Sequence, residues 1–118
     1  MKQIHLIGNL GNNCTEKVVK DKKVIHFSLC VNEKFKMQDG TFKETAYWFD
    51  CSLWVMASKT TDYSKIFIKG GKFYVRGIPS VYTYQKGNET IAGISVNIQE
   101  FEIISLPKPE EDTDNGTN

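Results

Sequence analysis

The chain has 118 residues, of which 40% are hydrophobic and 25% are charged, with a formal net charge of +1. This composition is typical of one soluble globular domain, and no apolar run approaches the roughly 20 residues that a membrane span requires. The N-terminal residues also lack the long apolar stretch of a signal peptide, so we expect a cytoplasmic protein without membrane contacts.

The charge is distributed unevenly along the chain. Residues 107–118 contain four acidic side chains against Lys108, so the remaining body carries 14 basic and 10 acidic side chains, a net charge of +4. A basic body followed by an acidic tail is typical of proteins that bind polyanions. We predict one domain over residues 1–106 and a short acidic, disordered tail over residues 107–118.

Cysteine usage argues against two kinds of site. Cys14, Cys30 and Cys51 are odd in number and show no C-x-x-C spacing, which disfavours both a disulfide framework and a zinc centre. We interpret them as small packing residues and expect neither a metal nor a cofactor.

Short segments with a period of two dominate the first part of the chain. Residues 2–9 are predicted to form a first strand, and residues 14–20 to continue it after a bend that Gly8 and Gly11 allow. Residues 24–32 form the second strand, because apolar and polar residues alternate there most clearly.

Polar connections separate the later elements. Residues 33–45 are predicted as a loop, residues 46–55 as the third strand, and residues 58–68 as a short helix capped by Ser58 or Thr60. The last two strands span residues 73–84 and 90–106, the latter with a bulge near Gln99-Glu100. The pattern predicts an all-β, five-stranded OB-fold barrel with one short helix between strands 3 and 4.

The third strand carries the main functional signal, because alternate side chains of a strand point to opposite faces. One face is apolar and is expected in the core: Tyr47, Phe49, Cys51, Leu53 and Val55. The other face carries both tryptophans, Trp48 and Trp54. Two exposed indoles are costly unless something covers them, and a stacked nucleobase gains ~1–3 kcal/mol whatever its identity. The alternative is that a partner subunit or the neighbouring loop covers them.

Aromatic and basic side chains alternate around this strand, as a chain of bases and phosphates requires. The residues predicted to stack on bases are Phe35, Trp48, Trp54, Tyr82 and Tyr84. The residues predicted to contact phosphates are Lys34, Lys36, Lys43, Lys69, Lys72, Arg76 and Lys86.

No constellation for catalysis is visible in the sequence. His5 and His26 have no nucleophile nearby in sequence, and Gly70-Gly71 lacks the pattern of a phosphate-binding loop. Asp50 lies between the tryptophans, where we expect a lysine partner for it rather than a catalytic role. We therefore expect a binding protein and not an enzyme.

The order and spacing of four segments resemble the bacterial single-stranded DNA-binding proteins, in the compact form carried by some phages and mobile elements. These segments are Ile4–Gly11, Phe27–Glu33, Trp48–Trp54 and Ile68–Gly77. The resemblance covers residues 2–106. It implies an OB-fold protein that binds single-stranded DNA independently of sequence and protects it during DNA replication, recombination and repair.

The resemblance also implies site residues and an assembly. Phe35, Trp48, Trp54 and Tyr84 fall on the stacking aromatics of the family, and Lys69 on a basic position that contacts the DNA backbone. Family members are typically homotetramers, which we expect here, with a dimer as the other possibility. The C-terminal segment lacks the terminal apolar pair that docks partner proteins in the family, so recruitment through the tail is not expected.

Two other classes of OB-fold protein fit the same pattern. A dimeric replication-restart accessory protein would bind single strands beside a helicase, and an RNA-binding OB domain would use the 2′-hydroxyl. A purely structural OB subunit is the remaining alternative.

Overall fold

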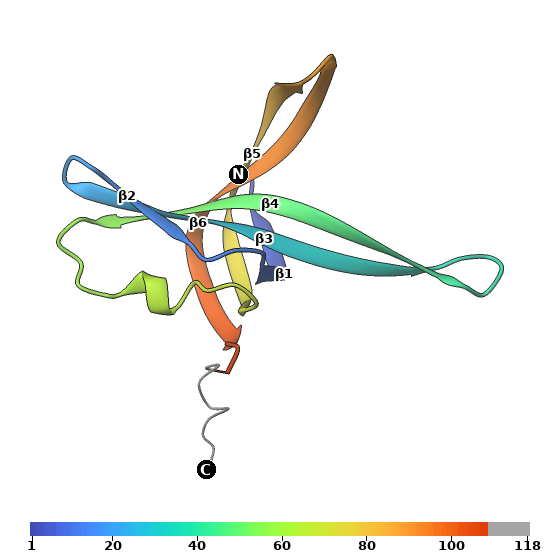
Figure 1. Ribbon diagram of the computed structural model, residues 1–118, viewed down its shortest axis with the longest axis horizontal. Helices are drawn as coiled ribbons and strands as arrows, with labels where there is room; N and C mark the ends of the chain where they lie inside the picture. The colour runs from blue at the N-terminus through green and yellow to red at the C-terminus, as the bar shows by residue number, and fades with distance from the viewer. Residues whose placement is uncertain (109–118) are drawn as a thin grey trace, which may run out of the picture.

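The computed structural model describes residues 1–108 of the chain, and almost all of its regular structure is β-strand (Figure 1). The strands are β1 (Ile4–Leu10), β2 (Thr15–Val19), β3 (Lys22–Lys36), β4 (Phe42–Met56), β5 (Lys72–Lys86) and β6 (Glu89–Ser105). A three-residue 3-10 turn, η1 (Tyr63–Lys65), lies between β4 and β5. The predicted acidic tail lies outside the described residues from position 109 onward. No helix within residues 1–108 is long and apolar enough to cross a bilayer.

Five strands close into a ring. The hydrogen-bonded order is β1-β5-β6-β4-β3-β2, and β1 also pairs with β3 through Asn9–Cys30 and Leu10–Leu29. β1 and β3 approach closely, since a Cβ atom on Gly8 would lie 2.4 Å from the Cys30 carbonyl oxygen. The ring of β1, β5, β6, β4 and β3 fits the predicted OB-fold. Residues 14–20 do not continue the first strand as predicted; among residues 1–108, β2 pairs with β3 alone, as a sixth strand.

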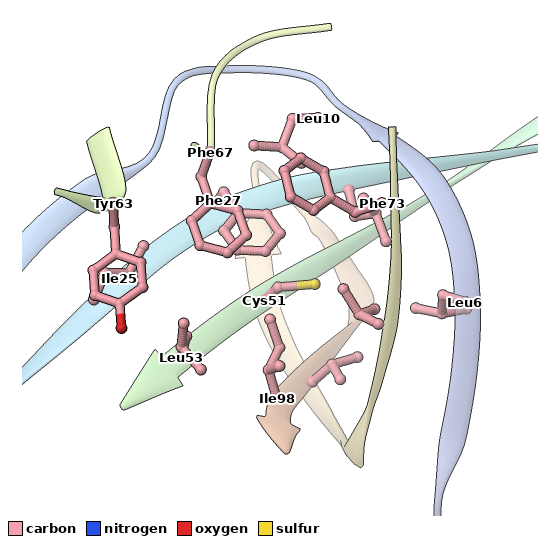
Figure 2. Close-up of a cluster of buried hydrophobic side chains, with 13 residues drawn as sticks. Leu6, Leu10, Ile25, Phe27, Cys51, Leu53, Tyr63, Phe67, Phe73 and Ile98 are labelled. Atoms are coloured by element: carbon pink, nitrogen blue, oxygen red, sulfur yellow. The ribbon is translucent and has the colours of Figure 1, made fainter. Parts of the chain in front are cut away.

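The interior of the ring is filled by the alternate apolar side chains of each strand (Figure 2). The buried residues are Leu6, Leu10, Ile25, Phe27, Leu29, Cys51, Leu53, Tyr63, Phe67, Phe73, Val75, Val96 and Ile98. Burial raises the pKa of the Cys51 thiol to about 12, so this cysteine is a packing residue, as predicted. The predicted bulge is also confirmed, because Arg76 pairs with Glu100 and Gly77 with Ile98, which leaves Gln99 as the extra residue.

The segment between β4 and β5 forms one 3-10 turn instead of the predicted helix over residues 58–68. Its cap is Asp62, whose carboxylate accepts a hydrogen bond from the Ser64 backbone N–H (3.2 Å). Thr, Asp and Ser side chains compete for backbone groups in this way and favour caps over helix interiors. The turn nevertheless delivers Phe67 into the core, where its ring lies 4.7 Å from that of Phe27 and 5.0 Å from that of Phe73 (Figure 2).

Two long hairpins extend beyond the ring (Figure 1). Residues 33–45, predicted as a loop, instead continue β3 and β4 as a paired arm whose register runs to Lys36–Phe42. Its turn is closed by a hydrogen bond from the Met37 N–H to the Thr41 carbonyl (2.7 Å). Tyr47, predicted in the core, lies at the base of this arm beyond the packed interior and is 41% exposed. The second arm is formed by β5 and β6, which pair as far as Lys86–Glu89.

Candidate nucleic-acid interface

The two tryptophans lie on the outer face of β4, as the alternation predicted. Trp48 is 58% exposed and Trp54 is 46% exposed, whereas Cys51 and Leu53 on the opposite face are buried. The segment 33–45 extends away from the ring as a hairpin arm (Figure 1), and both indoles stay open to solvent. Coverage by the neighbouring loop, one of the two alternatives to base stacking, is therefore wrong for this chain.

Trp48 rests on the backbone of the bend after β1. A Cβ atom on Gly11 would lie only 2.4 Å from the Cζ3 atom of the indole, so the ring packs directly over this glycine. The Gly11 N–H in turn donates a hydrogen bond to the Ser28 carbonyl of β3 (3.0 Å), which fixes the bend. One side of the indole is thus supported by hydrogen-bonded backbone while much of the ring stays open to solvent, which is the geometry of a stacking platform.

Tyr82 reaches across β6 to β4. Its hydroxyl donates a hydrogen bond to the Asp50 carboxylate, and its ring covers Gly93, whose added Cβ atom would lie 2.4 Å from the ring. The partner of Asp50 is therefore this tyrosine and not the lysine that the sequence suggested. The contact gives this half-buried carboxylate a hydrogen-bond donor. It also holds the ring of Tyr82 beside that of Tyr84, with centroids 6.1 Å apart.

The strand register joins these side chains into one surface. Tyr82 pairs with Gly93 on β6, and Ser95, the next residue on that face, pairs with Asp50 on β4. Cross-strand partners share a face of the sheet, so Trp48 and Trp54 of β4 lie on the same outer side of the ring as Tyr82 and Tyr84 of β5. We call this surface the aromatic face; it consists of Trp48, Trp54, Tyr82 and Tyr84.

Five of the predicted phosphate and stacking residues lie on the two arms, three on the side of the aromatic face and two on the opposite side. Lys86 has the same strand parity as Tyr82 and Tyr84, and Lys34 and Lys36 have the parity of Cys30, the partner of Trp48. Phe35, in contrast, pairs with Lys43 on the opposite side of the β3–β4 arm.

Phe42 is an aromatic residue on the side of the arm that Trp48 occupies, and the sequence did not single it out for stacking. It is 62% exposed, and the Lys34 ammonium lies 5.6 Å from the centre of its ring. An aromatic ring beside a lysine is the pairing expected where a base stacks and the adjacent phosphate is neutralised. The Phe42-Lys43 dipeptide was a visible signal, but only the register of the arm shows which side the ring occupies.

Lys69, Lys72 and Arg76 form a separate group. Lys72 and Arg76 lie on the half of β5 that pairs with β1, whereas Tyr82 and Tyr84 lie on its other half, beyond that pairing. The Arg76 guanidinium is held by Glu100 (Nε to Oε1, 3.0 Å) and by Gln99 (3.0 Å), which reduces its availability to a phosphate. Lys69 and Lys72 are exposed, and their role as phosphate contacts remains a prediction.

The hydrogen bond between Tyr82 and Asp50 makes a testable pH prediction. Donation to the carboxylate raises the pKa of Tyr82 above the ordinary tyrosine value near 10. The contribution of this contact to stability is therefore complete below that value and is lost as pH rises through the raised pKa. The variant Asp50→Ala should bring the Tyr82 pKa back toward 10, measured by NMR titration of ¹³Cζ-labelled tyrosine. An unchanged titration in Asp50→Ala would show that the contact does not form in solution.

A closed ring of OB topology with exposed aromatic side chains and lysines on its outer surface defines the class of protein: an OB-fold protein with a surface suited to single-stranded nucleic acid. Comparison with known families makes this specific. Residues 1–104 match the model of the Single-strand binding protein family, and the chain belongs to that family.

The family assignment agrees with individual relatives. A single-stranded DNA-binding protein of Aquifex aeolicus (strain VF5) is 24% identical over 112 residues, which cover 94% of this chain and 75% of that protein.

Two solved structures share the fold. The small single-stranded DNA-binding protein of Streptomyces coelicolor superimposes with a TM-score of 0.67 at 14% identity, covering 86% of this chain and 93% of that one. The Plasmodium falciparum SSB in complex with ssDNA gives a TM-score of 0.64 at 23% identity, covering 91% and 96%.

Proposed function

We propose that this protein binds single-stranded DNA without regard to base sequence and protects it during DNA replication, recombination and repair. The observation that carries the proposal is the aromatic face: four exposed rings on one side of an OB ring, bordered by lysines. Membership of the single-strand binding protein family supports the same ligand, as does the name of the Aquifex relative.

The chemistry of binding follows from the two kinds of side chain on this surface. Each base that stacks on a ring gains ~1–3 kcal/mol, and every base offers the same π-face, so stacking tolerates any sequence. Each lysine that neutralises a phosphate releases a counterion, which makes affinity fall with salt. Because Trp48 rests on Gly11 and Tyr82 is tied to Asp50, two of the rings lose little conformational freedom on binding.

The arms extend the proposed path. Phe35 and Lys43 lie on the side of the β3–β4 arm opposite to Trp48, so they contact the same strand of DNA only where it passes around the arm. The DNA can reach the lysines on the side of the aromatic face without passing around an arm; these are Lys34, Lys36 and Lys86. We expect no catalysis, no cofactor and no membrane contact, and we expect the protein to act in the cytoplasm.

We also propose that the chain assembles into homotetramers. Residues Ile4–Gly8 of β1 pair only with β5 among residues 1–108, which leaves the other edge of this segment open to pair with another chain. Ile7 on the same strand is 55% exposed. The mass of the protein in solution distinguishes a tetramer from the dimer expected of a replication-restart accessory protein.

Competition binding tests the choice of ligand. A fluorescent oligo(dT) bound to the full chain should be displaced by poly(dT) at much lower concentration than by duplex DNA or by poly(rU), with an affinity for oligo(dT) that falls steeply between 50 and 200 mM salt. Stronger displacement by poly(rU) would favour the RNA-binding alternative instead. Affinity independent of salt would remove the phosphate contacts from the proposal.

A further inference from the structure

A shallow pocket lies at the end of β4, where the predicted stacking residue Trp54 meets two lysines that the sequence did not single out. Its volume is about 310 Å³, and it is lined by Lys22, Trp54, Val55, Met56 and Lys59. The volume is at the lower end of the ~300–1,000 Å³ of sites for small ligands. Its lining combines an indole and aliphatic side chains with two ammonium groups. This combination suits a ligand in which a flat ring is joined to an anionic group.

The register of β3 and β4 places the first lysine. Val24 pairs directly with Trp54, and Lys22 pairs with Met56, so Lys22 is a diagonal neighbour of Trp54 on the same outer face. Such neighbours lie ~7–8 Å apart, within the reach of a lysine side chain.

The second lysine is positioned by the turn that follows β4. The Ala57 N–H donates to the Asp21 carbonyl (2.8 Å), and the Lys59 N–H donates to the Met56 carbonyl (3.0 Å). The Lys23 ammonium donates to the Lys59 carbonyl (3.2 Å). These three hydrogen bonds hold the turn that carries Lys59 beside the pocket.

The two pocket lysines differ from Lys23 in their partners. Lys23 is engaged by Glu16 (3.8 Å) as well as by the Lys59 carbonyl. Over residues 1–108, neither Lys22 nor Lys59 forms an ion pair with a carboxylate. Their charges are thus available to an anion.

We propose that Lys22 and Lys59 hold the phosphate of the nucleotide whose base stacks on Trp54, which adds two phosphate contacts to the proposed interface. The proposal rests on the proposed function, because Trp54 belongs to the aromatic face. It assigns the pocket to DNA rather than to a free metabolite because the pocket is continuous with that face. The bound strand then continues past Trp54 toward the turn between β2 and β3.

The test compares the salt dependence of oligo(dT) binding in the full chain and in Lys22→Gln/Lys59→Gln. Each phosphate contact on a single strand contributes about 0.7 to the slope of log K against log salt, so the double variant should lose about 1.4 from the slope. Lys2→Gln/Lys65→Gln is the matched control, because it removes two exposed lysines that lie on neither β3 nor β4; its slope should equal that of the wild type. Lys22→Arg/Lys59→Arg keeps both charges and should restore the slope.

The outcomes separate the pocket from the proposed function. If the wild type binds oligo(dT) and the pocket variant keeps the wild-type slope, the pocket is not a phosphate site although the function stands. If the wild type does not bind oligo(dT), the proposed function itself fails. A loss of slope in the glutamine pair that the arginine pair does not restore, with unchanged circular dichroism, also overturns the proposal.

Discussion

The double variant Trp48→Ala/Trp54→Ala is expected to bind oligo(dT) ~2–6 kcal/mol more weakly than the wild type, a loss of at least about 30-fold. The two positions are six residues apart on one strand, about 20 Å, so their contributions should add. Both indoles are exposed, which leaves the core intact. The measurement is an oligo(dT) titration by anisotropy, with the melting temperature of each variant recorded alongside.

Tyr47→Ala is the matched control for this loss. Tyr47 directly precedes Trp48 in the sequence, is 41% exposed, and points to the opposite side of β4 from Trp48. Its replacement should leave affinity within a few-fold of the wild type. If the tryptophan variant instead changes the mass of the protein in solution and binds DNA normally, a partner subunit covers the indoles and the stacking interpretation is wrong.

Phe67→Ala is expected to destabilise the fold by ~3–5 kcal/mol, the largest effect of any single substitution considered for this chain. Phe67 is fully buried although it comes from an irregular segment, and its ring lies within 5.0 Å of those of Phe27, Phe73 and Phe101. Its removal would leave a cavity among three strands of the ring. Urea unfolding followed by circular dichroism measures the change.

Phe42→Ala provides the comparison for the core variant. Phe42 is the same residue type but is 62% exposed at the tip of the β3–β4 arm, so its replacement should change stability by less than about 0.5 kcal/mol. Similar losses for the two variants would mean that the interior of the ring is not packed around Phe67.

The outward placement of the tryptophans could be predicted because it depends only on the period of two along β4. The indoles lie among polar residues of one parity, and the buried Cys51 and Leu53 lie on the other. The same alternation predicted the ring and its bulge at Gln99, where the parity of the apolar residues changes.

The arms could not be predicted from that signal. Residues 33–45 are solvated on both sides, so no face of the hairpin needs to be apolar, and a polar paired strand then has the composition of a loop. What holds the arm is its backbone ladder from Glu33–Thr45 to Lys36–Phe42. The error mattered for the site, because only the register shows that Phe35 and Lys43 share the side opposite to Trp48.

Contacts between segments that are distant in the chain could not be predicted from the sequence either. Tyr82 meets Asp50 because β6 lies between their strands and carries a glycine, Gly93, at the crossing. Lys59 stands beside Trp54 because the turn after β4 is tied to the turn between β2 and β3. Local periodicity predicts neither of these two contacts. Both affect the proposed interface, because one involves the Asp50 carboxylate and the other the Lys59 ammonium.

The most direct test of the account is the intrinsic tryptophan fluorescence of the full chain during titration with oligo(dT). Both tryptophans of the sequence lie on the aromatic face, so stacking of bases should quench the emission to a plateau that the single variants Trp48→Ala and Trp54→Ala each reduce. An emission spectrum that stays unchanged when the oligonucleotide is fully bound would contradict the central claim that these rings hold the bases.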